Sequence, residues 1–285
     1  MLLAIDARNR AISLGFFEKA GAGAAGPGRC LSRRRIGALP GRSADEYALL
    51  MRDFAGELAR DLSPVDGLGG LRVEAAWMSS VVPSLTRELN RAVESAFGLT
   101  CSIVGPGLRS GVKIRTDLPS EVGSDLVCAA VAARELVRGP CVVVDFGTAI
   151  TFSAVGRSGD FLGAAIAPGM ATAAESLRAS AAQIPEVSME GPCAALGRST
   201  AQAVRAGITI GYAGLVDRIT RLQREEIAAR GEADSPEDVA VLGTGDEEGA
   251  AVLASLDLGR FVPDLVLEGL SIIAGRASPL PRATA

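Results

Sequence analysis

One pattern of residues occurs twice in this 285-residue chain and limits what the chain can fold into. Cys141–Val155 reads CVVVDFGTAITFSAV, in which apolar residues lead to Asp145, a Gly-Thr turn follows, and a second apolar stretch leaves. Leu2–Ile5 leads in the same way to Asp6, and a short turn then leads to the apolar stretch Ala11–Phe17. Asp6 and Asp145 lie 139 residues apart, close to half the chain. The pattern predicts a duplicated domain with a cleft between the two copies.

The second copy indicates what its acid could do. The run of valines at 142–144 is typical of a buried strand. Asp145 then needs a partner, because burying an isolated carboxylate is costly. Gly147 and Thr148 predict a tight turn whose N–H groups and hydroxyl suit an anion. Alternatively, Asp145 only caps its own turn.

Composition and charge exclude several classes of protein. Hydrophobic residues make up 48% and charged residues 22%, as in a soluble globular protein. The net charge of −4 gives no sign of the excess positive charge with which proteins bind nucleic acid or an anionic membrane. The five cysteines are scattered and have no CxxC spacing, which predicts reduced thiols. The sequence shows no apolar run of about 18 residues and no signal-peptide pattern, so we expect a cytoplasmic protein.

The chain has no histidine, which restricts its chemistry. Ser-His-Asp and Cys-His nucleophiles and His-ligated metal sites are excluded. Acid–base chemistry must therefore rest on carboxylates, Lys, Tyr, Cys or water, and a metal would be a hard cation held by oxygen atoms.

Periodicity and turn signals predict the order of the elements. Besides the two N-terminal strands, strands are expected at residues 73–78, 102–104, 141–145, 149–155, 161–167 and 239–242. Helices are expected at 44–61, 84–97, 121–137, 172–182 and 199–229, loops at 20–29 and 61–70, and a frayed tail from 278. Strands followed by alternating helices and strands, in two halves, predict an α/β protein with mixed sheets.

Several short motifs occur in a specific order along the chain. They are Asp6, Gly105–Leu108 (GPGL), Pro119–Asp125 (PSEVGSD), Val144–Ala149 (VDFGTA), Ala165–Gly169 (AIAPG), Ser199-Thr200 and Ala206-Gly207. Together they resemble the type III pantothenate kinases, a group that includes the Bvg accessory factors and belongs to the acetate kinase/sugar kinase/Hsp70/actin superfamily. The resemblance implies two ribonuclease-H-like (actin-like ATPase) halves, residues 1–118 and 119–285, and a homodimer.

The resemblance also implies roles for the matching residues. Asp125 is implied to be the base that accepts the proton of the pantothenate hydroxyl, and Asp145 to bind a monovalent cation, potassium or ammonium. ATP with Mg²⁺ is implied to contact Thr148 and the loop that comprises Asp6, Ala7, Arg8, Asn9, Arg10, Ala11, Ile12 and Ser13. The implied substrate residues are Thr116, Gly123, Ser124, Asp125, Leu126 and Thr200. Alternatively, Asp125 only favours a helix N-terminus and Ser199-Thr200 only cap the long helix.

This sequence departs from the family at several of these positions. The family's phosphate loop reads Asp-Val-Gly-Asn-Thr-Asn, whereas Arg8 and Arg10 replace its Gly and Thr here. Glycine allows a close backbone approach to phosphate. Two arginines can instead neutralise phosphate through their side chains, or fill the nucleotide site. Leu126, Thr116 and Asp246 replace an Arg, a Tyr and a Gly.

Three functions are compatible with the sequence. The first is ATP-dependent phosphorylation of pantothenate to 4′-phosphopantothenate, the first step toward coenzyme A. The second is a catalytically impaired paralogue with a regulatory or scaffold role. The third is a kinase of another small hydroxyl compound. The first is favoured because the chain retains Asp6, Asp125, Asp145 and Thr148. The second is favoured by the altered phosphate loop.

Overall fold

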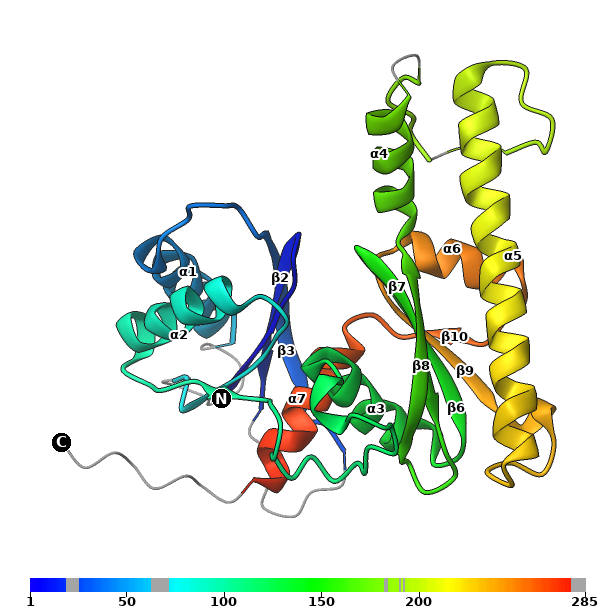
Figure 1. The fold of residues 1–285 in the computed structure, drawn as a ribbon. Coiled ribbons are helices and arrows are strands. Elements are labelled where there is room, and N and C mark those ends of the chain that lie inside the picture. The colour runs from blue at the N-terminus through cyan, green and yellow to red at the C-terminus, as the bar shows by residue number, and fades with distance from the viewer. Residues whose placement is uncertain (19–25, 63–71, 182–183, 190, 192, 278–285) are drawn as a thin grey trace. The chain divides into compact units, whose positions relative to one another are not determined.

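The structure is a computed structural model that describes residues 1–18, 26–62, 72–181, 184–189, 191 and 193–277 (Figure 1). The chain forms two compact units, each described here by itself. Unit 1 comprises Met1–Val112, Asp117–Leu136 and the segment that begins at Asp264, and unit 2 comprises Lys113–Thr116 and Val137–Pro263.

Unit 1 is built on a five-stranded mixed sheet with the strand order β3-β2-β1-β4-β5. The strands are β1 (Leu2–Ala7), β2 (Ala11–Phe17), β3 (Cys30–Gly37), β4 (Ala75–Ser80) and β5 (Ser102–Ile103). β2 is antiparallel to β1 and β3, whereas β4 is parallel to β1 and β5.

Helices cover both faces of this first sheet. The helices α1 (Ala44–Leu62) and α2 (Pro83–Phe97) pack in one core with Leu3 and Ile5 of β1. Because side chains alternate along a strand, Asp6 faces the opposite side. On that side α7 (Leu265–Arg276) contacts β1, β2 and β4.

Unit 2 repeats the same sheet, in the order β10-β9-β6-β7-β8. Its strands are β6 (Cys141–Phe146), β7 (Ala149–Val155), β8 (Phe161–Pro168), β9 (Ala240–Gly245) and β10 (Arg260–Phe261). Its helices are α4 (Met170–Ser180), α5 (Thr200–Ala229) and α6 (Glu248–Ser255). β6 pairs antiparallel with β7 and parallel with β9, as β1 does with β2 and β4. The duplication and the mixed sheets predicted from the sequence are therefore confirmed.

Two helices from distant parts of the chain complete unit 1. α3 (Ser124–Val137) and α7 approach so closely that a Cβ on Gly269 would lie 2.6 Å from the carbonyl carbon of Cys128. The backbone N–H of Gly28 donates a hydrogen bond to Ser271 Oγ of α7 (3.0 Å). Unit 1 therefore also contains segments that follow the expected boundary after residue 118.

The observed elements differ from the expected ones at several ends. The helix expected from residue 121 begins at Ser124, because Pro119–Glu121 forms a separate 3-10 turn, and β4 runs to Ser80 rather than to Met78. Strand β3 was not expected, because Arg33–Arg35 interrupt its apolar pattern. The expected loop 20–29 lies partly outside the described residues, as does 61–70, and the tail from 278 lies wholly outside them.

Two further findings concern the whole described chain. None of the helices that the structure describes is both long and apolar enough to cross a membrane. All five cysteines are free thiols: Cys101, Cys128 and Cys141 are buried, and Cys30 and Cys193 are partly buried.

Candidate active site

In unit 1 the carboxyl ends of two parallel strands meet the N-terminus of α3. Asp6 lies near the end of β1, in register with Ser79 on β4. The Oγ atoms of Ser79 and Ser124 are 2.9 Å apart, and the backbone N–H of Ser80 donates to Ser124 Oγ (3.2 Å). These hydrogen bonds fix the start of α3 beside the strand that carries Asp6.

Asp125 lies in the first turn of α3, where an acid is favoured by the helix dipole. The side chain is half-buried, and its Oδ1 accepts a hydrogen bond from the backbone N–H of Leu126 (2.9 Å). A Cβ on Gly123 would collide with this oxygen, so glycine leaves room for the carboxylate. The sequence-predicted neighbours Gly123, Ser124 and Leu126 are therefore next to Asp125 in space.

The buried thiol of Cys128 is influenced by both acids of unit 1. Burial raises the pKa of Cys128 well above its usual value, and the charges of Asp6 and Asp125 raise it further. The positive charge of Arg8 opposes this rise. Asp6, Arg8 and Asp125 therefore all lie near enough to the Cys128 thiol for their charges to affect it.

Arg8 forms an ion pair with Asp6. Its Nε donates to Asp6 Oδ2 at 2.7 Å, and the side chains are 24% and 7% exposed. The backbone N–H of Arg8 donates to the carbonyl of Ala11 (3.0 Å) and closes the turn between β1 and β2. In the rest of the predicted ATP loop, Ala7 and Ile12 are buried, Ser13 is half-buried, and Asn9 and Arg10 are exposed.

In unit 2, Asp145 occupies the position that corresponds to Asp6. It is 3% exposed and lies in register with Thr151 on β7 and Thr244 on β9. Gly245 has a φ of +96°, and a Cβ there would lie 2.6 Å from Asp145 Oδ1. Glycine at the end of β9 therefore allows the backbone to pass close to the carboxylate.

The turn after Asp145 is held by the N-terminus of α4. The carbonyl oxygen of Thr148 accepts hydrogen bonds from the backbone N–H of Gly169 (2.9 Å) and from Thr172 Oγ1 (2.7 Å). A Cβ on Gly169 would lie 2.9 Å from that oxygen. The motifs DFGT and APG, which have 18 residues between them, thus form one tightly packed structure in unit 2.

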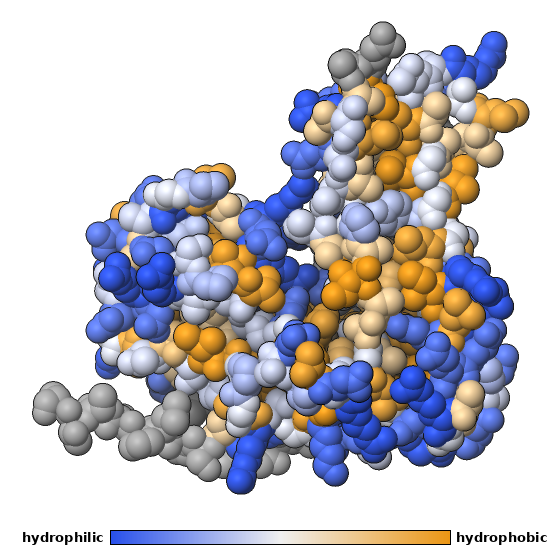
Figure 2. Space-filling view, viewed as in Figure 1, coloured by the Kyte–Doolittle hydropathy of each residue, from blue (hydrophilic) through white to orange (hydrophobic). Residues whose placement is uncertain are grey.

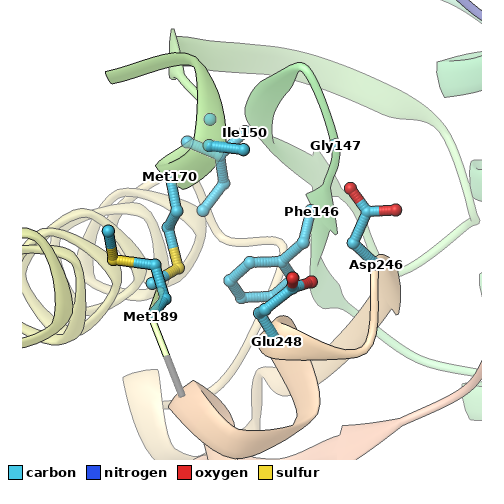
Figure 3. Close-up of a pocket in the computed structure, with 9 residues that line it drawn as sticks. Phe146, Gly147, Ile150, Met170, Met189, Asp246 and Glu248 are labelled. Carbon is cyan, nitrogen blue, oxygen red and sulfur yellow. The ribbon is translucent and has the colours of Figure 1, made fainter. Parts of the chain in front are cut away.

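A pocket opens beside this turn (Figure 3). It is lined by Phe146, Gly147, Ile150, Gly169, Met170, Ala171, Met189, Asp246 and Glu248. Phe146 and the two methionines form an apolar side, and the carboxylate of Asp246 lies beside the Phe146–Gly147 turn. Such a pocket suits a compact organic group that combines an apolar face with N–H or O–H donors.

Two further sequence-predicted residues, Thr116 and Thr200, belong to unit 2. Thr116 belongs to a short segment of unit 2 next to β8, where the N–H of Arg115 donates to the carbonyl of Phe161 (2.8 Å). Its Oγ1 is buried without a hydrogen-bond partner among the described residues. Thr200 is exposed, and Ser199 caps α5 by accepting from the backbone N–H of Gln202 (3.3 Å).

Sequence reasoning missed Ser79 and Glu248. The strand that carries Ser79 was expected to end at Met78, one residue too early, although a Ser-Ser pair directly after an apolar strand was visible. Glu248 gave no signal, because its place in the pocket depends on the pairing of β9 with β6. No group of three or more His, Cys, Asp or Glu side chains is placed to hold a metal in the part of the chain that the structure describes.

Comparison with known proteins identifies the family. The sequence model described as type III pantothenate kinase matches residues 2–222. The chain belongs to this family. A type III pantothenate kinase of Moorella thermoacetica is 37% identical over 276 residues, which cover 97% of this chain and 99% of the relative. One from Dehalococcoides mccartyi is 35% identical over 279 residues, covering 95% and 94%.

A solved structure agrees with the fold. A protein from Campylobacter jejuni described as a Baf family transcriptional activator matches with a TM-score of 0.54 at 15% identity, covering 95% of this chain and 96% of that one. At this identity the likeness concerns the fold alone. The family resemblance and the fold class predicted from the sequence are confirmed, and the family is one of kinases, which use ATP and a divalent metal.

Proposed function

We propose that this chain transfers a phosphoryl group from ATP to the hydroxyl of pantothenate and so forms 4′-phosphopantothenate, the first step of coenzyme A synthesis. The observation that carries the proposal is that the charges of Asp6 and Asp125 both act on the Cys128 thiol of α3, whose first residue is hydrogen-bonded to the strand beside Asp6. It occurs in a chain whose relatives, over nearly its whole length, are named type III pantothenate kinases.

Asp125 acts in this proposal as the base for the substrate hydroxyl. Phosphoryl transfer needs positioning and charge neutralisation, and a carboxylate within hydrogen-bonding reach can take the hydroxyl proton. Gly123 gives the carboxylate room, and the N–H of Leu126 orients it. Further contacts to pantothenate are assigned to Ser124, Thr116 and Thr200.

The loop from Asp6 to Ser13 and the hydroxyl of Thr148 are assigned to the phosphates of ATP. A divalent metal bound at this loop would neutralise the charge of the phosphates. The acids here are aspartates, whose oxygen atoms fit Mg²⁺, and a chain without histidine favours such a hard cation.

Asp145 is assigned to a monovalent cation, potassium or ammonium. It is a buried carboxylate beside Thr244, and Gly245 leaves space around Oδ1. Activity is therefore expected to rise when potassium replaces sodium, and the Asp145→Asn variant should lose this response. Equal activity in both salts would contradict the assignment.

The direct test is ADP release by the purified protein with Mg-ATP, potassium and pantothenate. Asp125→Asn is expected to lower kcat by about 10²–10⁴-fold with little change in the KM for ATP. Asp53→Asn, at an exposed position on α1, is the matched control and should retain wild-type kcat. Absence of pantothenate-dependent ADP release in the wild type would favour the non-catalytic alternative.

We also propose a homodimer that is formed through α4 and α5. These helices run side by side (Figure 1), and α4 contains no fully buried residue. Leu177 on α4 is 40% exposed and Ile210 on α5 is 46% exposed, and Figure 2 shows hydrophobic residues gathered over this pair. Apolar helix faces of this kind are typically covered by a partner.

Light scattering after gel filtration tests the dimer. The wild type should have twice the mass of the 29.1 kDa chain, and the double variant Leu177→Asp/Ile210→Asp should be a monomer. Leu49→Asp on α1, where the leucine is 61% exposed, is the control and should not change the mass. A monomeric wild type would refute the proposal.

We also assign the protein to the cytoplasm, since five free cysteines suit a reducing compartment.

A further inference from the structure

We propose that Arg115 is a positioning residue for the substrate: it docks the segment Lys113–Thr116 on β8 and so presents the hydroxyl of Thr116 to pantothenate. The inference rests on the proposed function, in which Thr116 contacts pantothenate. Its basis is the guanidinium of Arg115, which bridges two acids of unit 2. Its Nη2 lies 2.7 Å from Asp160 Oδ2, and its Nη1 lies 2.9 Å from Glu232 Oε1.

The segment Lys113–Thr116 is a short part of unit 2 whose neighbours on both sides in the chain belong to unit 1. The backbone N–H of Arg115 donates to the carbonyl of Phe161 (2.8 Å), and the N–H of Phe161 donates to the carbonyl of Lys113 (2.8 Å). Ile114 thereby pairs in parallel with the first residue of β8. Because each of these hydrogen bonds replaces one to water, their net contribution is small, and the side chain of Arg115 must supply the rest of the attachment.

Both acids that contact the guanidinium are themselves fixed in unit 2. The side chain of Asp160, directly before β8, is 7% exposed, and a carboxylate so buried needs a cation beside it. Glu232 Oε2 accepts the backbone N–H of Arg157 (3.0 Å), and a Cβ on Gly156 would lie 2.6 Å from the same oxygen. Since a guanidinium is a rigid planar fork, contacts at two of its nitrogens set the orientation of the Arg115 side chain.

Thr116 directly follows Arg115, and its hydroxyl is suited to a ligand. Thr116 Oγ1 is buried and has no hydrogen-bond partner among the described residues. A buried hydroxyl without a partner destabilises the folded state, and such a group is explained when a bound molecule supplies the partner. Pantothenate carries hydroxyl, amide and carboxylate groups, each of which can form a hydrogen bond with a threonine hydroxyl. The docked backbone determines where this hydroxyl lies.

Binding of pantothenate, measured by calorimetry, tests the inference. Arg115→Gln should weaken binding by about tenfold, as expected when one neutral hydrogen bond is lost. Arg157→Gln is the matched control, because its side chain is 53% exposed against 51% for Arg115 and pairs with Asp234 rather than with an acid that holds the segment. This control should bind pantothenate within about twofold of wild type, since an exposed ion pair contributes little. In the kinase assay Arg115→Gln should raise the KM for pantothenate and leave the KM for ATP unchanged.

A double-mutant cycle with Thr116→Val separates positioning from a purely structural role. Thr116→Val removes a hydroxyl that has no partner among the described residues and keeps the shape of the side chain. It should therefore weaken pantothenate binding by about tenfold without lowering Tm. Because Arg115 acts through this hydroxyl, adding Arg115→Gln to Thr116→Val should weaken binding by less than about twofold more. Separate effects that multiply to about a hundredfold would overturn the inference, as would wild-type affinity in either single variant.

A measurement without ligand tests the docking itself. Hydrogen exchange at the amide of Phe161 should be faster in Arg115→Gln than in Arg157→Gln, and equal protection would contradict the docking role. If Arg115→Gln does not fold, Arg115→Lys keeps the charge without the planar fork, and its affinity should still fall several-fold at an equal Tm; an unchanged affinity would refute the role of the guanidinium.

Failure of the inference and failure of the proposed function give different results. A wild type that binds pantothenate but releases no ADP would refute only the kinase activity, and the comparison of affinities would still decide the role of Arg115. A wild type that binds no pantothenate would refute the inference together with the substrate assignment.

Discussion

The packing of α3 on α7 gives a sharp prediction about a single methyl group. In Gly269→Ala the new Cβ would lie 2.6 Å from the carbonyl carbon of Cys128 and 3.0 Å from its Cα. The first of these is 0.8 Å closer than the 3.4 Å at which ordinary contact begins. Because both neighbouring atoms are backbone, neither can rotate away, and α3 and α7 must separate.

The size of the effect follows from two opposing contributions. Overpacking costs about 1–3 kcal/mol, and a clash with backbone should lie at the upper end. Replacing glycine with alanine inside a helix stabilises the helix by about 1 kcal/mol. We therefore expect Gly269→Ala to lower the free energy of unfolding by about 2 kcal/mol, equivalent to a Tm decrease of about 4–8 °C.

Gly56→Ala in α1 is the matched control, because it makes the same change inside another helix of unit 1. The nearest atom to a Cβ there is the flexible tip of Arg60, at 3.7 Å. Gly56→Ala should therefore raise the free energy of unfolding by up to about 1 kcal/mol. Thermal unfolding of both variants checks the prediction. If Gly269→Ala is as stable as Gly56→Ala, the close approach of α3 and α7 is wrong. Since α3 carries Asp125, Gly269→Ala should also reduce kcat.

Three further outcomes are expected. Ser124→Ala should lower the free energy of unfolding, measured in urea, by about 1 kcal/mol, because the start of α3 loses its hydrogen bond to β4. It should also lower kcat more than it changes KM, and an unchanged kcat would argue against a role for this hydrogen bond. Tyr212→Phe removes the 2.6 Å hydrogen bond from the hydroxyl to the last carbonyl of β8 and should also lower the free energy of unfolding by about 1 kcal/mol. A variant as stable as the wild type would contradict this prediction. Burial raises the pKa of Cys101 and Cys141 from the usual 9.0 to about 12. Because the unfolded chain loses these thiol protons at a lower pH than the folded one, the contribution of the two thiols to the free energy of unfolding is complete below pH 9 and is lost as the pH rises toward 12. The stability difference between wild type and Cys141→Ala should therefore narrow from pH 8 to pH 11, and a constant difference would contradict the raised pKa.

Local sequence patterns predicted the parts of the fold that depend on local forces. The valine run of β6 and the glycine turn after it define both the strand and the position of Asp145, since β-branched residues and glycine have strong backbone preferences. The repeat of this pattern at Asp6 correctly predicted two similar sheets. Strand β3 was missed because it lies at a sheet edge, where its arginines reach solvent and partners such as Glu268.

The contacts of the candidate active site were harder to predict, because they join elements that are distant in the chain. Ser79 and Ser124 are 45 residues apart, and no periodicity indicates that their hydroxyls meet. The Arg8–Asp6 pair was closer to prediction. Arg8 lies directly after β1, only two residues from Asp6, and a buried acid attracts a cation. The sequence left open whether Arg8 would fill the nucleotide site or contact phosphate.

The return of α7 to the first sheet has a consequence for synthesis on the ribosome. Translation supplies β1 among the first residues, but the helix that covers its Asp6 face comes more than 250 residues later. Until α7 has emerged, apolar side chains on that face have no cover, which is the condition in which nascent chains recruit chaperones or aggregate. The two units are therefore expected to mature in reverse order, with the second sheet closing before the first.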